Sequence, residues 1–182
     1  MDDISKLILP VYSGTDHYEG RSFIVAPYLV TAAHVVIDLP LPYVLLENGK
    51  YELKSENAIS VLYNHSLNED CAIFKLPQTY QSPFQLADII PQRQEILTCY
   101  CIKQQNRCIS VSTAKIFHTE EKAFMCYMDP MLCGGDSGSP ILNAKNEIVG
   151  MLVAGDNKSI CAFQSATFIK NIINNYLEQH II

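Results

Sequence analysis

The chain has 182 residues, enough for one domain or for two small domains that share a core. Hydrophobic residues make up 48% of it and charged residues 18%, against about 25% charged residues in ordinary globular domains, which excludes a disordered chain. The 13 Lys and Arg residues against 19 Asp and Glu residues give a net charge of −6, which argues against nucleic-acid binding, because that needs a basic face. The longest uncharged stretch, residues 22–37, is too short to cross a bilayer, so no membrane partner is expected.

Short strands are predicted along most of the chain, because runs rich in Val, Ile, Tyr, Phe and Thr are separated by turn residues. The first set comprises residues 6–12, 21–26, 43–46, 58–63 and 71–76. Residues 77–94 contain three prolines and indicate a linker. The second set comprises residues 95–102, 107–116, 123–128, 141–142, 147–154 and 159–163. Two groups of short strands favour two small sandwiches or barrels.

The end of the chain predicts an amphipathic helix over residues 166–179. Its apolar residues recur at steps of three and four, with Lys and Asn on the opposite face. The apolar residues are Phe168, Ile169, Ile172, Ile173, Tyr176 and Leu177. We expect this stripe to pack against the second group of strands.

The seven cysteines are an odd number, and several stand among apolar residues, as Cys71, Cys126 and Cys161 do. A chain of this length can build a core without disulfides, so we interpret most of them as buried free thiols. The first residues also lack the basic and then apolar segments of a secretory signal. Both observations predict the cytoplasm or another reducing compartment, and a mature fragment of a larger precursor fits the same pattern.

The strongest chemical signal is the run CGGDSGSP at residues 133–140. Glycines on both sides of Ser137 allow a tight turn with positive φ, which leaves the hydroxyl exposed. Such a turn can also direct successive backbone N–H groups at one point, as an oxyanion hole requires. A serine is a weak nucleophile and needs a base within hydrogen-bonding reach. A glycine-rich turn that contains a serine is common, so the other motifs are needed to assign a function to it.

Two further runs supply a base and an acid. In FIVAPYLVTAAH, residues 23–34, small alanines precede His34 and would let the imidazole reach a cleft. Taken alone, this run would favour His34 as a core histidine. In EDCAIF, residues 69–74, Asp70 begins an apolar strand, where a carboxylate is costly unless it is paired. His34 is a suitable partner for Asp70, while Glu69 and, less favourably, Asp38 are alternative acids.

These three runs, in this order, resemble the His, Asp and Ser motifs of chymotrypsin-like (trypsin-like) serine proteases. The resemblance implies an all-β fold of two six-stranded antiparallel barrels with a C-terminal helix and a cleft between the barrels. The first barrel would cover residues 1–80, the linker 81–94 and the second barrel 95–182. It implies a catalytic triad of His34, Asp70 and Ser137, an oxyanion hole made by the N–H groups of Gly135 and Ser137, and a protein or peptide substrate. No metal or cofactor is required.

The segment after Ser137 is similar to the bacterial glutamyl-endopeptidase type and to the picornavirus type of this family. Both often carry a histidine where this chain has Leu152, so specificity for Glu or Gln is in doubt. By position, Met131 and Leu132 would form the floor of the specificity pocket, and Leu152, Val153 and Gly155 its walls. None of these side chains is charged, which predicts an apolar residue before the scissile bond. Alternatively, Met131 and Leu152 belong to the barrel core, and a loop such as residues 156–159 reaches into the pocket.

The chain also departs from the digestive members of the family, in which a new amino terminus, usually Ile-Val-Gly-Gly, pairs with the Asp before the serine. No such segment precedes the barrel here, so Asp136 needs another partner or stays solvated, and activation by cleavage is not expected. Bacterial and viral sources both stay open, as do release from a polyprotein and export as an effector.

Two other readings stay open. The first is a non-catalytic peptide-binding or scaffold member of the fold. The second is a redox- or zinc-responsive protein, because Cys99 and Cys101 could be half of a zinc site; no second ligand pair follows Ser137. The remaining histidines stand in polar stretches and are expected in solvated loops: His17, His65, His118 and His180.

Overall fold

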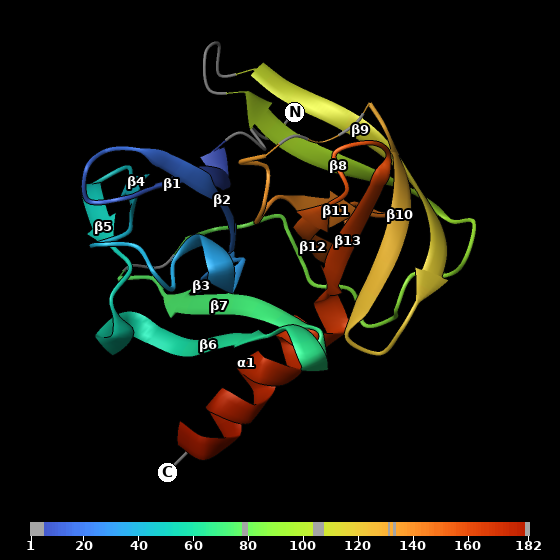
Figure 1. Ribbon diagram of the computed structural model, residues 1–182. Coiled ribbons are helices and arrows are strands. Elements are labelled where there is room, and N and C mark those ends of the chain that lie inside the picture. Colours follow the sequence, from blue (N-terminus) through green and yellow to red (C-terminus); the bar gives the residue numbers. More distant parts are fainter. Residues whose placement is uncertain (1–5, 78–79, 104–107, 131, 133, 181–182) are drawn as a thin grey trace.

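Figure 1 shows the computed structural model, which describes residues 6–77, 80–103, 108–130, 132 and 134–180. The strands of the first half, drawn in blue to green, lie beside the strands of the second half, drawn in yellow to red. The long helix α1 lies at the end of the chain, below the two groups of strands in this view. The predicted all-β class with a C-terminal helix is confirmed.

The first half forms one antiparallel sheet in the order β5-β4-β1-β2-β3-β7-β6. Its strands are β1 (Ile8–Tyr12), β2 (Tyr18–Val25), β3 (Tyr28–Thr31), β4 (Tyr43–Leu46), β5 (Gly49–Glu52), β6 (Ala58–Asn64) and β7 (Glu69–Lys75). This open seven-stranded sheet differs from the closed six-stranded barrel that we expected. A tight turn pairs Leu46 with Gly49, which adds β5 at one edge, while β6 stays at the other edge.

The second half closes into a six-stranded barrel in the order β10-β13-β12-β11-β8-β9. Its strands are β8 (Ile96–Lys103), β9 (Cys108–Thr119), β10 (Ala123–Asp129), β11 (Pro140–Leu142), β12 (Ile148–Gly155) and β13 (Ile160–Ser165). Alternate residues of β10 are buried, as expected of a strand with one face on a core. Phe124 and Phe163 stack inside this barrel, with their ring centroids 5.3 Å apart.

The segment predicted as a linker packs against both halves. Phe84 and Ala87 are buried, and Leu86 forms a parallel bridge with Ile148 at the start of β12. The linker therefore does more than connect, because it covers part of the second barrel.

The apolar stripe of α1 (Ala166–His180) packs differently from our expectation. Ile169 and Ile173 are buried in the core cluster that contains most first-half core residues, together with Ile148 and Met151 of β12. The helix thus joins the two halves, whereas we expected it to cover the second alone.

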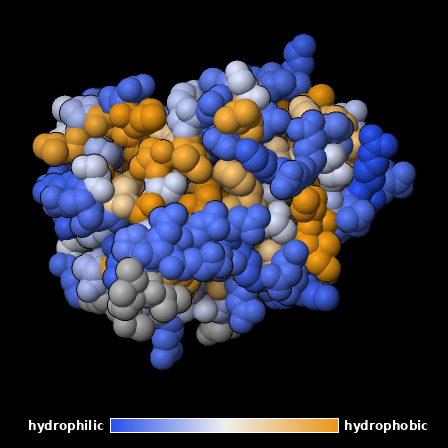
Figure 2. Space-filling model, turned by 90° about the horizontal axis from the view of Figure 1, so that it is seen from below, coloured by the Kyte–Doolittle hydropathy of each residue, from blue (hydrophilic) through white to orange (hydrophobic). Residues whose placement is uncertain are grey.

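The face of the molecule that carries α1 is mostly hydrophilic, with apolar side chains between the polar ones (Figure 2). Two of the exposed apolar residues are Val61 of β6 and Leu177 of α1. Among the described residues, no helix has both the length and the apolar character needed to cross a membrane.

Candidate active site

His34 lies in a short 3-10 turn, η2 (Ala33–Val35), directly after β3. Ala32 and Ala33 are fully buried, so the small residues pack the main chain closely under the imidazole. The His34 side chain is 32% exposed. This combination of a closely packed backbone and an accessible imidazole ring agrees with the expectation from the sequence.

Asp70, the second residue of β7, holds His34 through two hydrogen bonds. Its Oδ2 lies 2.6 Å from His34 Nδ1, and its Oδ1 accepts the backbone N–H of His34 at 3.0 Å. Since an ionised carboxylate can only accept, Nδ1 carries the proton and Nε2 is left as the basic nitrogen. Bonds to a charged group are the short and strong ones, so the orientation of the ring is well fixed.

The turn that carries Ser137 is docked onto β2. The backbone N–H of Arg21 donates to the carbonyl of Ser137 at 2.8 Å, and Thr31 Oγ1 donates to the carbonyl of Arg21 at 2.6 Å. Thr31 is the last residue of β3, three positions before His34. These bonds therefore hold the serine turn at the end of the β2–β3 hairpin that His34 follows.

Glycine is required at Gly138 for this docking. Gly138 has a φ of +90°, and a Cβ there would lie 1.8 Å from the carbonyl oxygen of Arg21. No side chain fits at that distance, so a larger residue would force the serine turn away from the first half.

Gly135 is held in place by Tyr18 of β2. The hydroxyl of Tyr18 donates to the carbonyl of Gly135, and the Tyr18 ring lies 2.8 Å from where a Gly135 Cβ would be. Gly135 has a φ of +91°, as a turn that redirects its N–H groups needs.

Asp136, the residue before the serine, is paired with Arg21. The Arg21 Nη2 atom lies 3.3 Å from Asp136 Oδ1, and the two side chains are 4% and 15% exposed. The Arg21 guanidinium also lies over the Tyr18 ring, 5.2 Å from its centroid. The partner that Asp136 was expected to need is thus supplied by β2.

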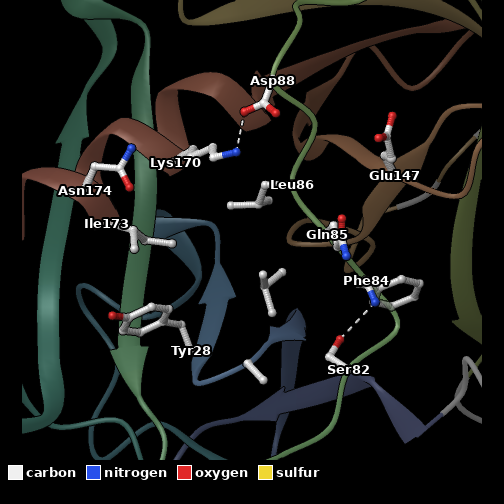
Figure 3. A pocket seen from close by; sticks show the side chains of 12 residues that line it. Tyr28, Ser82, Phe84, Gln85, Leu86, Asp88, Glu147, Lys170, Ile173 and Asn174 are labelled. Carbon is white, nitrogen blue, oxygen red and sulfur yellow. Dashed lines mark hydrogen bonds and ion pairs between the residues drawn. The ribbon is translucent and has the colours of Figure 1, made fainter. Parts of the chain in front are cut away.

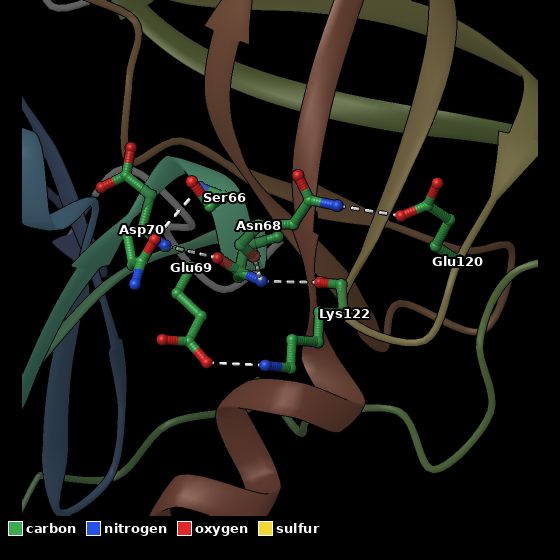
Figure 4. A network of polar contacts seen from close by, with 8 residues as sticks. Ser66, Asn68, Glu69, Asp70, Glu120 and Lys122 are labelled. Atoms are coloured by element: carbon green, nitrogen blue, oxygen red, sulfur yellow. Dashed lines mark hydrogen bonds and ion pairs between the residues drawn. The ribbon is translucent and has the colours of Figure 1, made fainter.

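Figure 4 shows why Glu69 differs from Asp70, although the two are neighbours. Glu69 forms an ion pair with Lys122 of the second half at 2.6 Å. The other alternative acid, Asp38, is exposed. Of the three carboxylates considered, Asp70 is the one that contacts His34.

The predicted specificity residues fall into two groups. Leu132 and Leu152 are buried in the core of the second barrel, and for Leu152 this agrees with the alternative in which Met131 and Leu152 belong to the core. Val153 is half-buried and Gly155 is exposed at the end of β12. Met131 lies outside the described residues.

The turn after β12 is closed by Asp156. Its Oδ1 accepts the backbone N–H groups of Lys158, Ser159 and Ile160 at 2.9 Å each. The bonds from Ile160 and Lys158 contribute most to lowering the pKa of Asp156. The carboxylate is thus occupied by its own turn.

A separate pocket of about 440 Å³ lies between the linker, the β2–β3 hairpin and α1 (Figure 3). Tyr28, Phe84 and Ile173 line it, and an ion pair between Asp88 and Lys170 stands at one side. It contains none of the residues predicted for catalysis or substrate binding.

The described cysteine side chains are buried: Cys71, Cys99, Cys126 and Cys161. Burial raises the pKa of the Cys71 thiol, and the negative charge of Asp70 raises it further. Burial also raises the pKa of the Cys126 thiol, to about 12. Buried thiols with raised pKa values are poor nucleophiles and poor metal ligands. Within the described part of the chain no three His, Cys, Asp or Glu residues form a group that could hold a metal, and the side chain of Cys101 lies outside that part.

The other histidines lie near the surface. His17, His65 and His180 are exposed, and His118 is partly exposed at the end of β9. His180 ends α1 instead of lying in a loop.

Comparison with known proteins assigns the family. The model of the trypsin family matches residues 10–171, nearly the whole chain. The chain belongs to the trypsin family. This trypsin-family chain is a serine endopeptidase, a hydrolase, and its substrates are proteins or peptides.

Solved structures share its fold at low sequence identity. The Rv3671c protease of M. tuberculosis, in an inactive mutant form, superposes with a TM-score of 0.68 at 15% identity, covering 98% of this chain and 90% of that one. Kallikrein-related peptidase 10 gives a TM-score of 0.73 at 14% identity, with 97% of each chain covered. A serine endoprotease of Yersinia pestis gives 0.73 at 16% identity, covering 96% of this chain and 64% of the other.

Proposed function

We propose that this endopeptidase cleaves peptide bonds with Ser137 as nucleophile, His34 as general base and Asp70 as the residue that orients the imidazole. The observation that carries the proposal is the 2.6 Å contact between His34 Nδ1 and Asp70 Oδ2. It leaves Nε2 free to take the Ser137 proton during attack and to return that proton to the leaving amine. Asp70 then stabilises the imidazolium that forms.

We further propose that the N–H groups of Gly135 and Ser137 bind the oxyanion of the tetrahedral intermediate. The positive φ of Gly135 and the bond from Tyr18 to its carbonyl support this assignment, because both restrict the orientation of the turn. Preorganised donors stabilise the developing charge without reorganising during the reaction.

The Ser137→Ala variant tests the proposal. The Ser137 side chain is small, so the variant should keep the thermal stability of the wild type, while turnover falls by about 10⁴- to 10⁶-fold. A fluorophosphonate probe should label the wild type and not the variant. If the variant hydrolyses peptides at nearly the wild-type rate, the nucleophile is misassigned; if the folded wild type neither labels nor hydrolyses, a non-catalytic scaffold is the correct reading.

We propose an apolar preference at the residue before the scissile bond. The uncharged end of β12, with half-buried Val153 and exposed Gly155, supports it, because a buried substrate charge would find no partner there. A medium apolar residue such as Leu, Met or Phe should be favoured by about 10- to 200-fold over smaller apolar ones. Profiling with a peptide library measures this, and a dominant Glu or Asp would instead indicate that Lys158 reaches the pocket from the Asp156 turn.

A further inference from the structure

Gln164 is a buried polar residue that contacts both halves of the molecule. It lies in β13 and is 1% exposed. A buried amide is tolerated when its donors and acceptor are satisfied. The three bonds of Gln164 are to backbone groups: Oε1 accepts the N–H of Asp70 at 2.8 Å, and Nε2 donates to the carbonyls of Asn68 at 3.0 Å and Lys122 at 2.6 Å.

The segment of residues 68–70 is bound to the second half at every position. Asn68, which has a φ of 53°, also donates from Nδ2 to Glu120 Oε2 at 2.9 Å, and Glu69 pairs with Lys122 at 2.6 Å. Figure 4 shows these contacts side by side. The Asn68–Glu120 and Glu69–Lys122 contacts involve charged groups that water and salt can reach, so each contact holds the segment weakly. The bonds of Gln164 are shielded from water and hold it more firmly.

The position of the Asp70 backbone determines the position of its carboxylate. The short aspartate side chain reaches His34 with both oxygens, one on Nδ1 and one on the backbone N–H. A shift of the Asp70 main chain would therefore lengthen both bonds together. Misplacement of a catalytic group by about 1 Å can cost on the order of 10²-fold in rate.

We propose that Gln164 is a positioning residue of the catalytic site. Gln164 belongs to the second barrel and binds the backbone N–H of Asp70. It thereby fixes the position of Asp70, the acid that belongs to the first half. This proposal rests on the proposed function, because it takes Asp70 as the residue that orients the base.

The Gln164→Met variant tests it, because methionine keeps the length of the side chain and removes its three hydrogen bonds. We expect kcat to fall by about 10- to 100-fold while KM changes less than about twofold. In NMR spectra the low-field proton resonance of His34 Nδ1–H should shift or broaden, because its short bond to Asp70 is disturbed. An unchanged kcat, or an unchanged resonance, would overturn the proposal.

Glu69→Gln is the matched control, because it removes a charge contact to the same Lys122 turn and leaves the Gln164 bonds in place. It should keep kcat within about twofold and keep the His34 resonance. An effect as large as that of Gln164→Met would show that any loss of contact between the halves acts in this way, and would overturn the assignment to Gln164.

A measurement on the wild type covers the case in which Gln164→Met does not fold. The amide hydrogen of Asp70, bonded to a buried Oε1, should exchange slowly with solvent, and fast exchange would contradict the proposal. Neither the exchange rate nor the His34 resonance needs turnover. Failure of the proposed function, which Ser137→Ala and the fluorophosphonate probe detect, is therefore distinguishable from failure of this inference.

Discussion

The contact between Asp70 and His34 decides which imidazole nitrogen is available as a base. The carboxylate binds Nδ1 from one oxygen and the backbone N–H from the other, so the ring has one tautomer and one orientation. Glu69, one position earlier, has the same chemistry but faces Lys122. Successive residues of a strand point to opposite faces, and this alternation separates the two acids.

Asp70→Asn should therefore be far more damaging than its conservative size suggests. The amide can donate to Nδ1 and so favours the wrong tautomer, and we expect turnover to fall by about 10⁴-fold with the fold intact. Steady-state hydrolysis of a peptide substrate measures the loss. A greater loss in Glu69→Gln than in Asp70→Asn would show that the acid is misassigned.

Arg21 is the buried cation that pairs with Asp136. Arg21→Met keeps much of the side-chain volume but leaves the Asp136 carboxylate without that cation. Removal of one partner from a buried ion pair typically costs about 3–5 kcal/mol, so the urea midpoint of unfolding should fall clearly. Asp136→Asn in the Arg21→Met background should recover part of the loss. Equal midpoints for wild type and Arg21→Met would contradict this role.

Among the structural elements, the turn over residues 134–138 depends on a glycine at position 138. Gly138→Ala would place a Cβ against the Arg21 carbonyl and would hold an unfavourable positive φ as well. We expect the serine turn to leave β2, with loss of fluorophosphonate labelling at Ser137 and a lower unfolding midpoint.

Gly134→Ala is the control in the same turn, because a Cβ there has no neighbour within 4 Å among the described residues. It should label at a rate close to that of the wild type. Wild-type labelling of Gly138→Ala would show that the docking of the turn on β2 is not needed for the nucleophile.

For the whole molecule, the buried thiols predict how stability depends on pH. The Cys126 thiol has its pKa raised to about 12 in the folded state by burial and by the neighbouring Cys161, whereas an unfolded thiol titrates near pH 8.5. Because the folded pKa is the higher one, this contribution to stability is complete below about pH 8.5 and is lost as the pH rises toward 12. The free energy of unfolding should fall by about 1–2 kcal/mol per such thiol between about pH 8 and 10.

Urea unfolding at several alkaline pH values measures this fall. The Cys126→Ala variant separates the thiol from other groups that titrate in the same range, and its stability should fall less steeply than that of the wild type. Parallel curves for the two proteins would show that Cys126 does not contribute.

Local patterns in the sequence determined the all-β class, most of the strands and the C-terminal helix. Alternating apolar residues and the recurrence at three and four positions are properties of neighbouring residues, so a sequence displays them directly. The three motifs likewise carried the candidate triad, because each is a short run that resembles the His, Asp or Ser motif of chymotrypsin-like serine proteases. The strand β5 was missed, because its residues, Gly49–Glu52, are mostly polar and form no run rich in Val, Ile, Tyr, Phe or Thr.

Only the tertiary structure decided which distant residues meet. Arg21 and Asp136 are 115 positions apart, and Asp70 and Gln164 are 94 positions apart, so no local pattern relates them. The placement of α1 against both halves and of Leu152 in the barrel core has the same origin. An apolar side chain reveals that it will be buried, because burial follows from its own hydration, but its neighbours depend on how both halves of the chain close around it.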